Sequence, residues 1–133
     1  MKTVSEDDLN VVDSSAWLEY FAGGPNAEHF ADAIENASAR VVPSITLLEV
    51  FKKICRQRDE ATALQYVAVM QQGRVVELDA ALAIHAAELG LRHKLPLADS
   101  VIYATAQSAR ATVWTQDADF EGLPDVRYWP GGG

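Results

Sequence analysis

VVDSSAWLEYF, residues 11–21, places an ionisable side chain directly between a short apolar run and two serines. Val11 and Val12 are β-branched and favour a strand, whereas serine is a residue type that begins helices. A strand followed at once by a helix is the repeating unit of α/β proteins. Because removing a carboxylate from water costs free energy, Asp13 at this junction needs either a structural partner or a chemical role.

The rest of the chain continues the alternation of strands and helices. Further β-rich runs are predicted as strands at residues 40–42, 74–78, 112–115 and 126–129. The segments between them have helical periodicity or helix-capping residues, and they cover residues 14–21, 26–39, 45–57, 59–73, 80–94 and 96–110. Ser44, Asp59 and Asp79 are the expected caps of three of these helices. No repeat and no linker divides the chain, so we expect one α/β domain over residues 1–133, with a flexible N-terminal extension at 1–9 and a flexible tail at 131–133.

Composition and charge narrow the functional classes. The chain is 49% hydrophobic and 23% charged, and it lacks an apolar run of the roughly 20 residues that a membrane span needs. The single Cys55 excludes an internal disulfide, and we expect a buried thiol in a cytoplasmic protein. A net charge of −8 argues against a broad basic surface for nucleic acid. It does not exclude a metal-assisted nuclease, because bound cations are absent from that sum.

Acidic residues follow several of the predicted strands. Ligand sites of open α/β sheets lie outside the carboxyl ends of the strands. The acids expected there are Asp13, Glu49, Asp99 and Asp117, with Asp119 as a fifth. Acids that converge on one cleft repel one another unless a divalent cation lies among them. All-oxygen ligands suit Mg²⁺ or Mn²⁺, and the scattered histidines do not have the spacing of a zinc site.

Each acid also has an ordinary structural explanation when it is considered alone. Asp13 and Asp117 could cap the helices or turns that follow them. Glu49 could pair with lysines three and four residues later on the same helix. Asp99 shares a helix face with apolar residues, and either the helix dipole or an ion pair with Lys94 could stabilise its charge.

Four stretches in order resemble a known family: VVDSSAWLEYF, PSITLLEV, LPLADSVIYATA and VWTQDADF. They resemble PIN-domain ribonucleases, specifically the VapC toxins of type II toxin–antitoxin pairs. The resemblance implies a PIN-like three-layer α/β/α fold with a short central parallel sheet flanked by helices. It also implies a homodimer and a VapB-type antitoxin that blocks the acidic cleft. The family's four acids fall on Asp13, Glu49, Asp99 and Asp117.

The expected activity is metal-dependent hydrolysis of RNA phosphodiester bonds. Asp13, Asp99 and Asp117 are the predicted metal ligands, with Asp119 as an alternative fourth acid, and Glu49 either holds a second metal or orients water. The hydroxyls predicted to orient carboxylates are those of Ser14, Ser100 and Thr115. The basic residues predicted to contact RNA phosphates are Lys52, Lys53 and Arg56, with Arg58 just beyond their helix.

Two rival functions fit the same fold class. A receiver-like signalling module would use Asp79 as a phosphoacceptor, but such a module needs a lysine after its last long strand, and VRYWPGGG has none. A non-catalytic α/β binding domain would use its acids for contacts with a partner. Incubation with labelled RNA, with and without Mn²⁺, separates the three functions.

Overall fold

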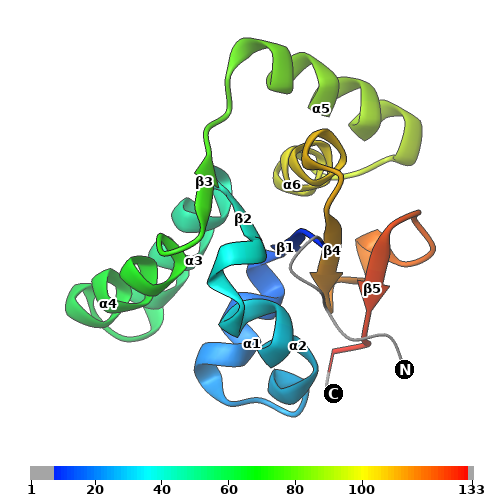
Figure 1. Ribbon diagram of the computed structural model, residues 1–133. Coiled ribbons are helices and arrows are strands. Elements are labelled where there is room, and N and C mark those ends of the chain that lie inside the picture. The colour runs from blue at the N-terminus through cyan, green and yellow to red at the C-terminus, as the bar shows by residue number, and fades with distance from the viewer. Residues whose placement is uncertain (1–7, 132–133) are drawn as a thin grey trace.

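The computed structural model describes residues 8–131, which form a parallel five-stranded sheet with helices on both faces (Figure 1). The strand order is β3-β2-β1-β4-β5, and every neighbouring pair is parallel. The strands are β1 (Asn10–Val12), β2 (Arg40–Pro43), β3 (Arg74–Val76), β4 (Thr112–Thr115) and β5 (Val126–Tyr128). The predicted α/β fold with a short central parallel sheet is therefore confirmed.

Six α-helices connect or cover these strands. They are α1 (Ser14–Ala22), α2 (Ala27–Glu35), α3 (Ser44–Gln57), α4 (Glu60–Met70), α5 (Ala80–His93) and α6 (Leu97–Ala109). The predicted caps Asp59 and Asp79 are confirmed, because their Oδ1 atoms accept hydrogen bonds from the backbone N–H of Thr62 at 2.6 Å and of Leu82 at 2.8 Å. In the part of the chain that the structure describes, no helix has both the length and the apolar character needed to cross a bilayer.

Two of the predicted helix boundaries need correction. The helix predicted over 26–39 ends at Glu35, and a separate 3-10 turn, Ala37–Ala39, follows Asn36, a residue type that favours helix ends. Ser44 is the first helical residue of α3 and not its cap, because Pro43 occupies the cap position.

The predicted terminal extensions are tested only in part. Residues 1–7, 132 and 133 lie outside the described residues. Leu9, within the extension predicted at 1–9, is held to the sheet, since its carbonyl accepts a hydrogen bond from the Thr112 N–H at 3.0 Å and its side chain packs on the core. Leu9 therefore belongs to the folded domain.

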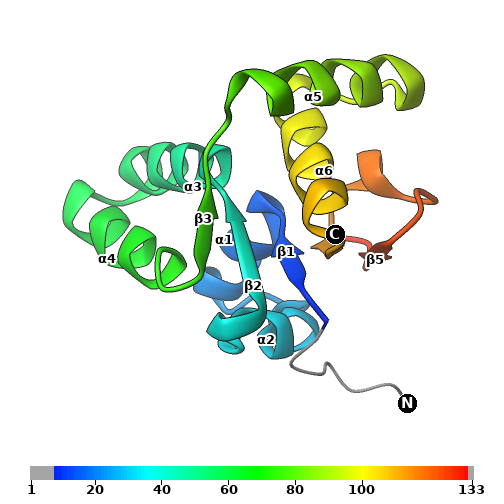
Figure 2. The same cartoon turned by 45° about the horizontal axis from the view of Figure 1, so that its top comes forward.

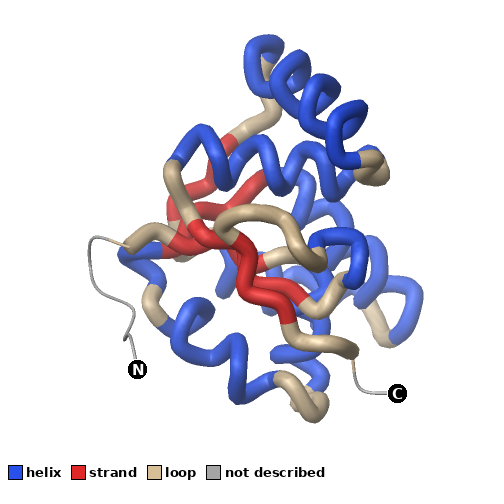
Figure 3. The backbone as a smooth tube through the Cα atoms, turned by 90° about the vertical axis from the view of Figure 1, so that its right-hand side faces the viewer, coloured by secondary structure: helices blue, strands red, loops and turns tan. Residues whose placement is uncertain are grey.

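Helices cover both faces of the sheet (Figures 2 and 3). A hydrophobic cluster lies on each face. Because side chains alternate along a strand, the adjacent Val11 and Val12 of β1 belong to different clusters. On one face Val11 packs with Ile102 of α6. On the other face Val12 packs with Trp17 of α1 and Phe30 of α2. Burial on both faces explains why the strands are rich in valine.

The strand order places the two central strands at a switch point. The chain runs from β1 to β2 and β3 on one side of the sheet and then returns to β4 and β5 on the other side. β1 and β4 are therefore neighbours whose connections leave in opposite directions, and ligand sites of open α/β sheets form at the carboxyl ends of such strands. Asp13 follows β1, and Asp117 follows β4.

Candidate active site

Asp13 is buried at the junction of β1 and α1 and is 2% exposed. Its Oδ2 atom accepts hydrogen bonds from the Ser15 hydroxyl at 2.5 Å, the Thr115 hydroxyl at 2.8 Å and the Ser15 backbone N–H at 3.3 Å. Asp13 is thus the cap of α1, as its structural explanation required. Capping does not account for the Thr115 contact, which comes from β4.

The charge of Asp13 is only partly stabilised by these contacts. Burial raises the pKa of Asp13 to about 6, although the hydrogen bonds from Ser15 and Thr115 act in the opposite direction. The negative charge of Asp117 raises the pKa further. An aspartate that caps a helix at the protein surface would keep a low pKa. The raised pKa of Asp13 means that its negative charge is poorly compensated, and a positively charged ligand would compensate it.

Three further carboxylates meet beside Asp13. Asp99 lies in the first turn of α6 and is 8% exposed, and Asp117 and Asp119 lie in the turn after β4. One carboxylate oxygen from each of these three residues lies within 4.8 Å of the other two. The backbone N–H of Asp119 also donates to Asp117 Oδ1 at 2.9 Å, which fixes the turn. Asp117 and Asp119, considered as alternatives from the sequence, therefore both lie in the cluster.

The pKa of Asp99 shows how crowded this cluster is. Burial, followed by the negative charges of Asp117 and Asp13, raises the pKa of Asp99 to about 8. Hydrogen bonds with Asp119 and Asp117 act in the same direction, because they favour the protonated carboxyl. A helix-dipole acid or an ion-pair partner of Lys94 would have a lowered pKa. The shift is opposite, so neither structural explanation describes Asp99.

Glu49, on α3, lies across the pocket from these acids. Its Oε1 atom accepts a hydrogen bond from the Ser14 hydroxyl at 2.7 Å, which is the kind of contact predicted for Ser14. Glu49, Asp13, Asp99 and Asp117 line one pocket of about 260 Å³, and Lys53 lines it as well. The structure thus brings all four predicted acids to one pocket, with one basic side chain among them.

Some of the predicted hydroxyl and basic residues lie at the acidic pocket and others do not. Thr115 contacts a carboxylate, as predicted. The prediction for Ser100 is wrong, because its hydroxyl donates to the Pro96 carbonyl at 2.9 Å within α6 and lies against Gly90 of α5. Lys52 and Arg56 are exposed on α3 and do not line the acidic pocket.

Ser15 is the residue that the sequence analysis missed. Its hydroxyl donates to Asp13 Oδ2 and accepts a hydrogen bond from the Gln116 backbone N–H at 3.3 Å. A serine two residues after an aspartate that caps a helix is placed to make such a contact, so the spacing of Asp13 and Ser15 carried the signal.

The residues present fit a divalent cation. Asp99, Asp117 and Asp119 offer three carboxylate oxygens close to one another, and hard oxygen ligands are those that Mg²⁺ and Mn²⁺ prefer. The raised pKa of Asp99 also indicates negative charge that the surrounding side chains do not balance. A cation held by these residues would supply that balance.

A family model supplies the identification, since the PIN domain model matches residues 11–126. The chain belongs to the PIN-domain family. No curated protein sequence matches the chain.

Solved structures similar to this PIN domain include several toxin–antitoxin proteins. A toxin–antitoxin complex from Klebsiella pneumoniae has a TM-score of 0.75 at 24% identity, covering 89% of this chain and 95% of that one. VapC20 of Mycobacterium tuberculosis, a sarcin–ricin loop cleaving toxin, has a TM-score of 0.73 at 20% identity, covering 88% and 96%. DNA-bound VapBC from Salmonella typhimurium has a TM-score of 0.70 at 19% identity, covering 92% and 98%. At these identities the likeness establishes a common fold.

Proposed function

We propose that this PIN domain is a Mg²⁺- or Mn²⁺-dependent endoribonuclease that acts in the cytoplasm as the VapC-type toxin of a type II toxin–antitoxin pair. One observation carries the proposal: buried carboxylates with raised pKa values converge at the switch point of the sheet. Such an arrangement destabilises the protein without a ligand, and it suits a divalent cation that binds a phosphodiester.

The similar structures support the biological role. They include toxin–antitoxin complexes and a toxin described as cleaving the sarcin–ricin loop of RNA. By analogy we expect a homodimer and a VapB-type antitoxin that covers the acidic pocket. The antitoxin should insert a basic side chain, because a cluster of carboxylates binds a guanidinium as well as a metal ion.

The residues of the pocket have separable roles. When bound, a divalent cation polarises the phosphodiester and lowers the pKa of a water molecule. Thr115 and Ser15 hold Asp13 Oδ2, which orients the other oxygen of Asp13 toward the pocket. Ser14 holds Glu49 Oε1, so Oε2 is the Glu49 oxygen left to orient the attacking water. Lys53 contributes a positive charge for a phosphate of the RNA.

The test is cleavage of an end-labelled single-stranded RNA. We expect cleavage with Mg²⁺ or Mn²⁺ and none with EDTA. Asp13→Asn should cut at less than about one hundredth of the wild-type rate, because loss of a ligand should cost at least as much as loss of the groups that orient it. Unchanged cleavage in EDTA would contradict the metal-dependent mechanism.

The same assay distinguishes the ribonuclease from its two rivals, since neither rival would cut the RNA. A non-catalytic binding domain would leave the RNA intact under every condition. A receiver-like module would incorporate phosphate at Asp79, but that carboxylate caps α5 and does not line the acidic pocket.

A further inference from the structure

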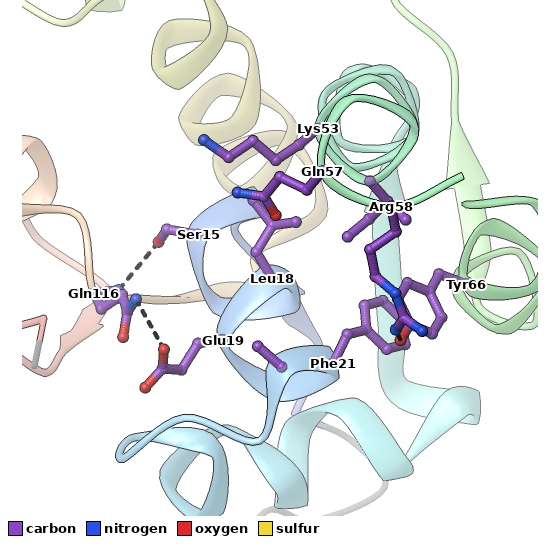
Figure 4. Close-up of a pocket in the computed structure, with 11 residues that line it drawn as sticks. Ser15, Leu18, Glu19, Phe21, Lys53, Gln57, Arg58, Tyr66 and Gln116 are labelled. Carbon is purple, nitrogen blue, oxygen red and sulfur yellow. Dashed lines mark hydrogen bonds between the residues drawn. The ribbon is translucent and has the colours of Figure 1, made fainter. Parts of the chain in front are cut away.

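A second hollow lies next to the acidic pocket, between α1, the end of α3 and the middle of α4 (Figure 4). It has a volume of about 370 Å³, within the usual size range of small-ligand sites. Ser15, Leu18 and Lys53 line both hollows, so they form the shared wall. We call this hollow the α1–α3 groove. It continues directly from the carboxylate cluster.

The far end of the α1–α3 groove is aromatic and positively charged. Phe21 and Tyr66 stack with their ring centroids 4.0 Å apart and their planes 1° apart. Arg58 Nη1 donates to the Tyr66 hydroxyl at 3.1 Å, which holds the guanidinium beside the rings (Figure 4). Unpaired nucleobases stack on aromatic rings and on guanidinium planes.

Side-chain amides and a carboxylate line the rest of the groove. Gln57 is exposed and extends from the end of α3 into the groove (Figure 4). Its amide offers both a donor and an acceptor, as the edges of bases require. Glu19 is the acidic residue of the lining, and its Oε2 atom accepts a hydrogen bond from the Asn26 backbone N–H at 2.8 Å. The charge of Glu19 is therefore already engaged within the protein.

The local charge differs from that of the whole chain. The end of α3 and the residue after it carry four of the eleven lysines and arginines of a chain whose net charge is −8. These four residues are Lys52, Lys53, Arg56 and Arg58. Lys53 and Arg58 line the groove, whereas Lys52 and Arg56 do not. The two cations that line it, beside a carboxylate site, favour a ligand that carries both a phosphate and an apolar ring.

We propose that the α1–α3 groove binds the base of an unpaired nucleotide next to the phosphodiester that the carboxylate cluster acts on. Lys53 contacts the phosphate at the shared wall, the base stacks on the Arg58 guanidinium beside the aromatic pair, and Gln57 contacts the edge of the base. The inference rests on the proposed ribonuclease function. It adds a single-stranded requirement at one defined nucleotide.

The experiment combines abasic substrates with groove variants. A single-stranded RNA with one mapped cleavage bond is made with an abasic nucleotide at each position flanking that bond. For the wild-type protein, one abasic position should lower kcat/KM about ten-fold, mainly through KM, because base stacking is lost there. Arg58→Ala and Gln57→Ala should lower kcat/KM on the intact RNA. Arg58→Ala should also remove most of the penalty of that abasic position.

Matched controls separate this effect from general losses. Arg92→Ala on α5 and Gln65→Ala on α4 change exposed residues outside the groove and should retain the wild-type response to the abasic substrate. Melting temperatures of all variants report whether they are folded.

Each outcome decides the proposal. A penalty at one abasic position that disappears in Arg58→Ala supports the base-binding groove. RNA cleavage without any such penalty, or with the same penalty in wild type and Arg58→Ala, overturns it while the ribonuclease function stands. The absence of cleavage by the wild-type protein with Mn²⁺ overturns both proposals.

Discussion

Asp13 and Arg40 are equally buried, at 2% exposure each, but their charges have very different surroundings. Arg40 lies at the amino end of the parallel strands, whereas Asp13 lies at their carboxyl end. Arg40 begins β2, and its guanidinium donates to the Ile34 carbonyl and to the Val69 carbonyl at 2.7 Å. It also lies over the Trp17 ring at 5.0 Å. The carbonyls that it binds end α2 and α4, where the helix dipoles are negative. These carbonyl contacts offset part of the cost of burying Arg40, although burial still lowers its pKa and its Nε atom has no hydrogen-bond partner among the described residues.

The carboxylate of Asp13 receives hydrogen bonds from two neutral hydroxyls and one backbone N–H, and the negative charge of Asp117 acts against its ionisation. Its pKa is raised to about 6, and that of Asp99 to about 8. A buried charge matched by oriented dipoles indicates a structural role, whereas a buried charge that faces like charges indicates a ligand site. The contrast predicts that removing the charge of Arg40 destabilises the protein, whereas neutralising a carboxylate of the acidic cluster stabilises it.

The largest expected effect is on Arg40. Arg40→Met should lower the free energy of unfolding by about 3 kcal/mol, because the buried carbonyls that end α2 and α4 lose charged donors. Arg40→Lys keeps the charge but not the planar fork of donors, so an intermediate loss is expected. Urea denaturation measures both. If Arg40→Met unfolds at the same urea concentration as wild type, the guanidinium does not stabilise the packing of α2 and α4.

Thr115 tests whether the hydroxyls that hold Asp13 matter for activity. Thr115→Val keeps the shape but removes the 2.8 Å hydrogen bond to Oδ2, and cleavage of RNA should slow by about ten- to a hundred-fold. Thr115→Ser should retain most of the rate. Thr105→Val is the matched control, because Thr105 is a buried threonine whose hydroxyl donates within α6, to the Val101 carbonyl at 2.7 Å. Equal rates for Thr115→Val and Thr105→Val would contradict a role in orienting Asp13.

The smallest expected effect is a gain in stability for Asp99→Asn. Without metal at pH 7, this variant should unfold at a temperature a few degrees higher, equivalent to about 1 kcal/mol, because Asp99 with its raised pKa must take up a proton on folding, whereas asparagine is neutral in both states. Asp32→Asn, which neutralises an exposed aspartate on α2, is the charge-matched control and should not share the gain. With Mn²⁺ the order should reverse, since wild type binds the cation better. A lower melting temperature for Asp99→Asn in EDTA would show that Asp99 is structural.

The pH dependence gives an independent check on Asp99. Its folded pKa of about 8 lies above the unfolded value of about 4, so the folded state binds more protons between these pH values. The stability of the metal-free wild type should therefore fall as pH rises from about 4 through about 8, and the advantage of Asp99→Asn should grow over that range. Melting curves in EDTA at pH 5, 7 and 9 measure this difference.

Local patterns in the sequence were sufficient to predict the elements and several caps. The valines of β1, the periodicity of α5 and the caps Asp59 and Asp79 depend on interactions within a few residues, so they can be inferred from spacing alone. The four acids could also be placed near strand ends. Their resemblance to a family pattern then identified them as a set.

Side-chain partners across the fold could not be inferred in this way. Thr115 reaches Asp13 because β4 pairs directly with β1, and the order β3-β2-β1-β4-β5 is a property of long-range packing. The hydroxyl of Ser100 donates to the i−4 carbonyl, as helical serines can, while Ser15 supplies the hydroxyl donor to Asp13 instead. Likewise, the α1–α3 groove is lined by residues of α1, α3 and α4. These helices meet only because their apolar faces pack on the same side of the sheet. Strand and helix formation follows local backbone and rotamer preferences, whereas the site depends on non-local contacts that exist only after the chain has folded.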